Sequence, residues 1–229
     1  LEPLVVNFSQ INVVCSGNIN GSIDLIVTGG TEPYTYVWSK DGGAFAPINQ
    51  NLTNLAPGTY DVTVTDSSGT PLTATVIDIT ITEPDAVVLT ATANSVSCNG
   101  AADAVITASS TGIGTGTITV DGNPYVATAT YGPGTYVVMA SYPDGNGIGV
   151  CTDIINVTIT EPDAVVLTAT ANSVSCNGAA DAVITASSTG IGTGTITVDG
   201  NPYVATATYG PGTYVVMASY PDGNGSGVC

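Results

Sequence analysis

The sequence contains two nearly identical copies of one long segment. Residues 80–151 align with residues 158–229 at a shift of 78 positions, and the only difference is Ile148 against Ser226. Self-similarity at a fixed period is typical of a modular array. This period is too long for one solenoid turn and suits a small complete domain. We therefore expect a tandem array of small domains.

A recurring Glu-Pro dipeptide predicts where these domains begin. It stands at residues 2–3, 83–84 and 161–162, each time before an apolar run. Proline fixes φ and removes a backbone donor, so it suits a short, stiff crossing between the last strand of one module and the first strand of the next. The third module is a near-copy of the second, and the first is a divergent relative. The predicted modules are residues 1–82, 83–160 and 161–229.

Strand patterns predict an all-β fold. Residues 59–66, TYDVTVTD, place Tyr60, Val62 and Val64 on one face and polar residues on the other, which is the alternation of a half-buried strand. Asp121-Gly122 between two apolar runs predicts a tight hairpin. Short strands with frequent turn residues are typical of a sandwich. Each module is expected to be an Ig-like antiparallel β-sandwich.

Charge excludes several classes of partner. The chain has 18 acidic residues, one basic residue and no histidine, for a formal net charge of −17. Binding to nucleic acid or to an anionic membrane surface requires lysine and arginine, so neither is expected. No apolar run is long enough for a membrane-spanning helix, so direct membrane insertion is not expected either.

Several blocks in the first module resemble a known repeat. They are Cys15-Ser16-Gly17, the string GGTEPYTYVWS at residues 29–39, and NLTNLAPGTYDVTVTD at residues 51–66. This pattern resembles the SprB-type repeat of the very large surface adhesins of gliding Bacteroidetes, with related Ig-like and PKD-like repeats sharing much of it. The second and third modules replace the middle block with GIGTGTITVDG. The resemblance implies a secreted, extracellular, cell-surface protein of tandem β-sandwiches, used in adhesion or gliding motility.

Four aromatic residues are expected to be structural. Tyr60, Tyr136 and Tyr214 each follow Gly-Thr at the start of a strand, where the hydroxyl of a tyrosine corner bonds back to the backbone. Trp38 lies within an expected strand and is interpreted as core packing. The alternative for both types is a ligand-binding role, with Trp38 as an exposed platform for a sugar.

The carboxylates predict no catalytic centre. Without histidine, the usual general base is missing. Asp103, Asp121 and Asp144 recur as Asp181, Asp199 and Asp222, but each lies in turn-like sequence where aspartate is common. The chain is therefore not expected to be an enzyme, and no cofactor is expected.

Calcium is the one metal for which the sequence offers oxygen ligands, and solvated turns are the competing interpretation. The weak candidates come from the later Glu-Pro-Asp junctions and from two Asp-Gly-Asn-Gly turns. They are Glu83, Asp85, Asp144, Asn146, Glu161, Asp163, Asp222 and Asn224.

Five cysteines allow two patterns of disulfides, which an acidic extracellular protein is expected to form. Pairing within modules gives Cys98–Cys151 and Cys176–Cys229 and leaves Cys15 alone. If each module has an odd number of strands, its ends lie at opposite poles. Neighbouring modules would then pair Cys15 with Cys151 and Cys98 with Cys229, leaving Cys176 for a further module. The sequence leaves both patterns open.

Near-identical copies add length rather than a new binding surface, so we expect a structural segment of a stalk or extracellular filament. Its expected partners are neighbouring modules of the same chain or filament. The alternative is an array in which each module binds a glycan of a surface polysaccharide weakly and gains affinity by multivalency.

Overall fold

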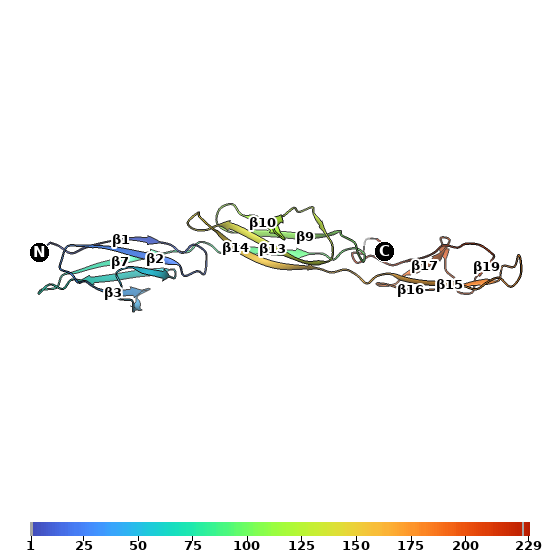
Figure 1. Ribbon diagram of the computed structural model, residues 1–229, viewed down its shortest axis with the longest axis horizontal. Helices are drawn as coiled ribbons and strands as arrows, with labels where there is room; N and C mark the ends of the chain where they lie inside the picture. Colours follow the sequence, from blue (N-terminus) through green and yellow to red (C-terminus); the bar gives the residue numbers. More distant parts are fainter. Residues whose placement is uncertain (1, 226) are drawn as a thin grey trace. The chain divides into compact units, whose positions relative to one another are not determined.

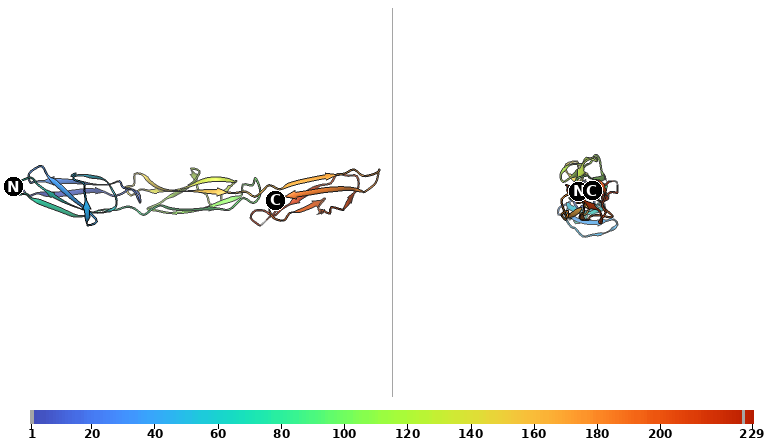
Figure 2. Two further views of the ribbon diagram at one scale, coloured as in Figure 1. Left: turned by 90° about the horizontal axis from the view of Figure 1, so that it is seen from below. Right: turned by 90° about the vertical axis from the view of Figure 1, so that its right-hand side faces the viewer.

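The computed structural model describes residues 2–225 and 227–229, and within them it contains strands and loops but no helix (Figures 1 and 2). The chain divides into two compact units. The first comprises Leu1–Leu89, Ser109–Thr119 and Met139–Ile154, and the second comprises Thr90–Ala108, Val120–Val138 and Ile155–Cys229. The unit boundaries fall inside the second predicted module, so the three-module division stays a prediction.

Residues 1–82 form two antiparallel sheets. One has the strand order β1-β2-β5 and the other β4-β3-β6-β7. The strands are β1 (Val5–Ile11), β2 (Gly21–Thr28), β3 (Thr35–Lys40), β4 (Gly43–Phe45), β5 (Leu52–Leu55), β6 (Gly58–Thr65) and β7 (Thr73–Ile81). The strand number is odd, as the alternative disulfide pattern requires.

Residues 83–160 repeat this arrangement. The sheet orders are β12-β9-β8 and β11-β10-β13-β14. The strands are β8 (Val88–Ala93), β9 (Ala104–Thr111), β10 (Thr117–Val120), β11 (Asn123–Pro124), β12 (Thr130–Tyr131), β13 (Gly134–Pro143) and β14 (Val150–Ile159).

Residues 161–229 form two three-stranded sheets, with orders β15-β16-β19 and β18-β17-β20. The strands are β15 (Val166–Ala171), β16 (Ala182–Thr189), β17 (Thr195–Val198), β18 (Asn201–Pro202), β19 (Thr208–Tyr209) and β20 (Val216–Ser219). Asp199 and Gly200 form the turn between β17 and β18 with φ of 47° and 78°. Two positive φ values are typical of a type I′ hairpin turn, and Asp121-Gly122 has the same geometry at 48° and 79°.

The core of residues 1–82 lies between its two sheets. In β6 the alternation read from the sequence is confirmed, because Tyr60, Val62 and Val64 are each at most 1% exposed. They pack in one cluster with Ile23 of β2 and Ile79 of β7. Burying such side chains is the main term that stabilises a small sandwich, at about 1.5–3 kcal/mol each.

The predicted fold class is confirmed: the chain is all-β, built of small antiparallel sheets that form tandem β-sandwiches. None of the described residues forms a helix that could span a membrane.

Candidate functional site

Two disulfides join cysteines that are far apart in the sequence. Cys15 bonds to Cys151 and Cys98 bonds to Cys229, with Cα atoms 5.6 Å apart in both pairs. Cys176 is exposed and unpaired. Each bond connects consecutive predicted modules, which is the alternative pattern of the sequence analysis. The within-module bonds Cys98–Cys151 and Cys176–Cys229 do not form.

The position of the turn that carries Cys98 explains why within-module pairing fails. The Val96 N–H donates to the Thr160 carbonyl at 3.1 Å, so this turn lies at the C-terminal end of β14. Cys151 is at the other end of β14. At ~3.3 Å per residue the two ends are ~30 Å apart, whereas a disulfide needs Cα atoms within about 7 Å.

The loops that carry Cys15, Cys98 and Cys176 share one hydrogen-bond pattern, and we call them the cysteine loops. The residue before the cysteine donates its N–H to a polar side chain five residues after the cysteine. These pairs are Val14 to Asn20 at 3.1 Å, Ser97 to Asp103 at 2.9 Å and Ser175 to Asp181 at 2.9 Å. The unpaired Cys176 therefore lies in a loop already folded like the two that form disulfides.

The glutamate of each later Glu-Pro binds the cysteine loop of the preceding segment. The Gly17 N–H donates to the Glu83 carboxylate at 2.6 Å, and the Gly100 N–H donates to the Glu161 carboxylate at 2.8 Å. A charged acceptor makes such a bond stronger than a neutral one. The recurring Glu-Pro thus combines a stiff backbone with an anchor for the neighbouring loop.

A second turn also donates a hydrogen bond to the same loop. The Gly145 N–H donates to the Val14 carbonyl at 2.8 Å, and the Gly223 N–H donates to the Ser97 carbonyl at 2.7 Å. A β-carbon on Gly145 would lie 3.3 Å from the Val13 carbonyl oxygen, so the turn approaches closely because the residue is glycine. We call each set of three contacts a junction: the disulfide, the bond to the glutamate carboxylate and the main-chain bond from the glycine. The first junction contains Cys15–Cys151, and the second contains Cys98–Cys229.

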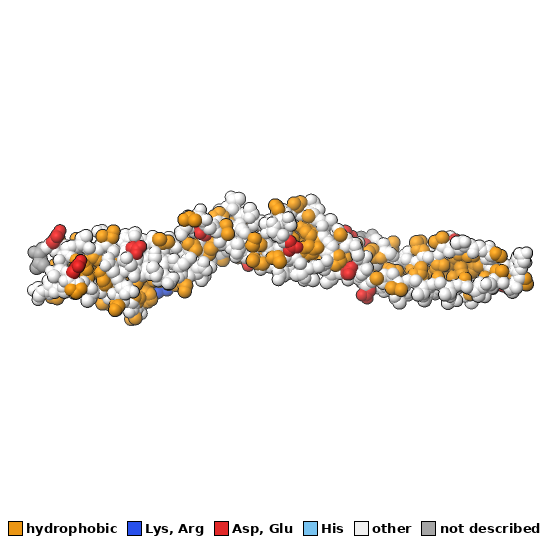
Figure 3. Space-filling view, viewed as in Figure 1, with side chains coloured by type: hydrophobic (Ala, Val, Ile, Leu, Met, Phe, Trp, Pro, Cys, Tyr) orange, Lys and Arg blue, Asp and Glu red, His pale blue; other side chains and the backbone are white. Residues whose placement is uncertain are grey.

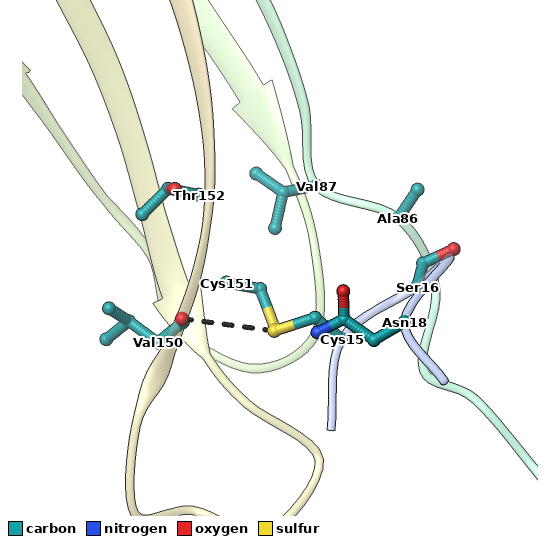
Figure 4. A pocket seen from close by; sticks show the side chains of 8 residues that line it. All are labelled: Cys15, Ser16, Asn18, Ala86, Val87, Val150, Cys151 and Thr152. Carbon is teal, nitrogen blue, oxygen red and sulfur yellow. Dashed lines mark hydrogen bonds between the residues drawn. A yellow bond between two sulfur atoms is a disulfide. The ribbon is translucent and has the colours of Figure 1, made fainter. Parts of the chain in front are cut away.

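Figure 4 shows the first junction from close by. Val150, Cys151 and Thr152 come from the start of β14, Cys15, Ser16 and Asn18 from the cysteine loop, and Ala86 and Val87 from the segment after Glu-Pro; together they line a hollow. The dashed line marks Cys15 Sγ and the Val150 carbonyl, 3.9 Å apart. A disulfide sulfur carries no proton, so this is a packing contact.

Several calcium candidates bind backbone amides in this structure. Glu83 and Glu161 accept the junction bonds described above. Asp144 accepts from the N–H groups of Asn146 and Ile148 at 3.1 and 3.0 Å. Burial alone would raise the pKa of Asp144, but its amide donors outweigh burial and lower the pKa. Asp85, Asp163 and Asn224 are exposed and Asp222 is buried. No group of three or more His, Cys, Asp or Glu gathers among the described residues.

The three tyrosines make the backbone bond expected of a tyrosine corner. Each hydroxyl donates to the carbonyl four residues earlier. The pairs are Tyr60 to Ala56 at 2.8 Å, Tyr136 to Gly132 at 3.0 Å and Tyr214 to Gly210 at 3.0 Å. Trp38 is only 2% exposed and its Nε1–H donates to the Asn49 carbonyl at 3.0 Å, which places it in the core and not on a sugar-binding surface.

The other aspartates that recur between the two copies stabilise turns and loops. Asp121 accepts from the Val137 N–H and Asp199 from the Val215 N–H, both at 2.8 Å. For Asp103, the Ser97 hydroxyl and N–H lower the pKa of the carboxyl group, and for Asp181 the equivalent Ser175 groups do the same. These roles are those of turn residues.

One structural role was not visible in the sequence. The ring of Tyr142 lies over Gly112 and Gly116, where added β-carbons would be 2.6 and 2.3 Å from ring carbons. Its hydroxyl donates to the Ser110 carbonyl at 3.0 Å. The sequence feature that could have revealed this packing is the GIGTG string at residues 112–116, which replaces the aromatic block of the first module. Its glycines leave space for the ring of Tyr142, which lies about 30 residues later in the sequence.

The cysteine loop of the first junction lies inside a recognised family pattern. Residues 7–43 match the SprB repeat family model. The SprB repeat match runs from β1 to the start of β4, and it confirms the resemblance over those residues. The structure is also similar to the three N-terminal domains of the Highly Immunogenic Outer Capsid protein (Hoc) of bacteriophage RB49. That similarity has 12% identity and a TM-score of 0.36, and covers 86% of this chain and 74% of the other. A comparison with curated proteins finds no match.

Proposed function

We propose that the chain is a structural repeat segment of a secreted cell-surface adhesin, and that it serves as an extended stalk or extracellular filament. The SprB repeat match supports a place in the repeat region of a surface adhesin. The two disulfides support an oxidising, extracellular location. Adhesion and gliding motility are implied by the family alone.

The observation that carries the proposal is that the two disulfides overlap along the chain. They close loops with sequence separations of 136 and 131 residues, and both loops contain residues 98–151. The shortest covalent path from Cys15 to Cys229 therefore runs through both bonds and only about 53 residues of backbone. If tension unfolded the sheets of such a stalk, the two disulfides would keep it from extending to the full length of its chain.

The similar fold of the three cysteine loops supports continuation of this pattern. Cys176 lies in the position of Cys15 and Cys98, and its loop has the same side-chain bond. We infer that Cys176 pairs with a cysteine placed like Cys151 in a further module. The two protons and two electrons of that pairing would pass to a thiol–disulfide oxidase or another disulfide. The partners in this proposal are modules of the same chain or filament.

Single-molecule stretching between tags at the two ends tests the proposal. A chain extends by at most ~3.6 Å per residue, so the oxidised segment from Cys15 to Cys229 should stop near ~190 Å. After reduction, the same about 214 residues should reach ~770 Å. An oxidised chain that extends as far as the reduced chain would contradict the proposal.

The competing function is weak, multivalent binding of glycans. A glycan array probed with the full oxidised chain separates the two, because a structural stalk should give no glycan-specific signal. Reproducible binding to one class of surface polysaccharide would favour the competing function.

A further inference from the structure

A hollow of about 400 Å³ lies against the core of residues 1–82 and shares no residue with either junction. β2 and β3 contribute one lining residue each, the loop between them contributes three, and the loop before β5 contributes the last. In that order they are Val27, Tyr36, Glu32, Pro33, Tyr34 and Gln50. We call this region the tyrosine hollow. In the other two predicted modules the string GIGTG replaces the aromatic block, so this set of side chains is particular to the first module.

The loop between β2 and β3 is held in place by the turn after β6. The Thr31 N–H donates to the Asp66 carboxylate at 2.9 Å, and Asp66 is only 4% exposed. The Ser67 hydroxyl donates to the carbonyl of Glu32 at 2.7 Å. The backbone that carries Glu32 is therefore fixed before any ligand arrives, which lowers the ordering cost of binding.

Hydrogen bonds inside the protein already use most of the side-chain donors of the tyrosine hollow. The Tyr34 hydroxyl donates to the Gly29 carbonyl at 2.6 Å, and the Tyr36 hydroxyl donates to Gln50 Oε1 at 3.0 Å. The Gln50 amide donates one of its two N–H groups to the Leu25 carbonyl at 2.7 Å. One amide N–H remains, against free lone pairs on both phenol oxygens and on Gln50 Oε1. The hollow therefore suits a ligand that donates hydrogen bonds.

The Glu32 carboxylate is the charged acceptor of the tyrosine hollow. The residue is exposed, and within the described part of the chain no hydrogen bond or ion pair reaches this carboxylate. It lies near Tyr36, because burial first, and then Tyr34 and Glu32, raise the pKa of that phenol. The fold thus leaves a negative charge without a structural partner beside two tyrosine rings.

The one basic side chain in the sequence is engaged elsewhere. Lys40 Nζ lies 5.6 Å from the centroid of the Tyr60 ring and 3.9 Å from the Asp41 carboxylate. An ammonium group is thus already held by a tyrosine ring and a carboxylate in the same module, and both attract cations. Figure 3 shows acidic side chains at several places along the chain, whose formal net charge is −17. This charge would attract a cation from outside.

We propose that the tyrosine hollow binds a lysine side chain of a partner protein. An ammonium group has three donors and no acceptor, which complements an acceptor-rich hollow. It would donate to the Glu32 carboxylate and lie against a tyrosine ring, while its methylene stem packs on Val27 and Pro33. This interaction goes beyond the stalk proposal and does not depend on it.

NMR titration of the full oxidised, 15N-labelled chain with Nα-acetyl-lysine methylamide tests this. Saturable shifts should gather at residues 25–36 and 50, whose sequence has no second copy in the chain. The norleucine analogue, which has an alkyl stem but no ammonium group, should cause no such shifts. Glucosamine, an ammonium group on a sugar ring, should bind more weakly. Absence of saturable shifts, or binding of either control as tight as that of the lysine compound, would overturn the proposal.

Matched variants separate binding in the hollow from general attraction of cations to an acidic chain. Glu32→Gln keeps the size of the side chain and removes its charge, and should weaken binding about threefold to fivefold, the loss expected for an exposed ion pair. Asp24→Asn removes an equal charge from an exposed residue of β2, on the face opposite to the buried Leu25, and should leave binding unchanged. Equal effects of the two variants would overturn the proposal.

Discussion

The backbone N–H of Gly100 donates to the carboxylate of Glu161 across 61 residues of sequence, at 2.8 Å. Gly17 and Glu83 make the same bond at the first junction. This relationship gives the recurring Glu-Pro a physical purpose: proline stiffens the crossing and glutamate ties it to the loop that carries the cysteine.

Replacing Glu161 with alanine should lower the free energy of unfolding by about 1 kcal/mol, since an exposed hydrogen bond to a charged group is lost. Urea unfolding of the oxidised chain measures the loss. Asp163→Ala is the matched control, because it removes an equal charge from an exposed residue two positions away. An equal effect of both variants would show that charge repulsion, and not the bond to Gly100, sets the stability.

Gly145→Ala should weaken the first junction. The added β-carbon would lie 3.3 Å from the Val13 carbonyl oxygen and 3.4 Å from that of Val14. The turn must then move away from the carbonyl to which Gly145 donates, at a cost of about 1–3 kcal/mol. Thermal unfolding checks this, with Gly132→Ala as the control, because its β-carbon would meet nothing closer than 3.8 Å. A melting temperature unchanged by Gly145→Ala would argue against close docking of this turn.

The loops that carry Cys98 and Cys176 should be sensitive to acid. Bonds from Ser97 lower the pKa of Asp103 in the folded state, and bonds from Ser175 lower that of Asp181. A lowered pKa contributes stability that is present above the unfolded value of about 3.9 and is lost as pH falls through the folded value. Urea midpoints should therefore decline below about pH 4.

Asp103→Asn together with Asp181→Asn provides the control for this acid sensitivity. The first module carries Asn20 at the equivalent position, so the loop accepts an uncharged side chain. The double variant should show a shallower decline between pH 4 and pH 2 than the parent. An identical decline would assign the acid sensitivity to other carboxylates.

The sequence predicted the parts of the fold that depend on local pattern. The alternation at Tyr60, Val62 and Val64 predicted a half-buried strand, and Asp121-Gly122 predicted a tight turn. It could not predict interactions that depend on distant partners. The packing of Tyr142 over Gly112 and Gly116 needs two segments about 30 residues apart to meet. The unequal lengths of β13 and β20 arise from pairing alone, since their sequences are identical.

At the junctions, too, the sequence predicted local features and could not predict those that depend on distant partners. Cysteine spacing allowed two pairings, and the choice depended on strand number, which decides at which end of a sandwich each loop lies. The sequence does contain a signal for the loop shape, since a polar residue follows Cys15, Cys98 and Cys176 by five positions, but its role emerged only with the hydrogen bonds. The sequence could not predict the hydrogen bond from Gly145 to Val14, because a main-chain bond between two predicted modules leaves no side-chain pattern.

Peptide mapping without reduction tests the connection between modules most directly. Cleavage before aspartate separates residues 1–23, which contain Cys15, from residues 144–152 and 222–229. The last two peptides differ in mass because Ile148 is replaced by Ser226 and because only the first of them ends in an additional residue, Thr152. The peptides that carry Cys98 and Cys176 are identical, so Cys15 is the decisive residue. The account predicts that the Cys15 peptide is crosslinked to residues 144–152. A free Cys15 thiol, with residues 144–152 crosslinked to the DAVVLTATANSVSCNGAA peptide, would contradict it.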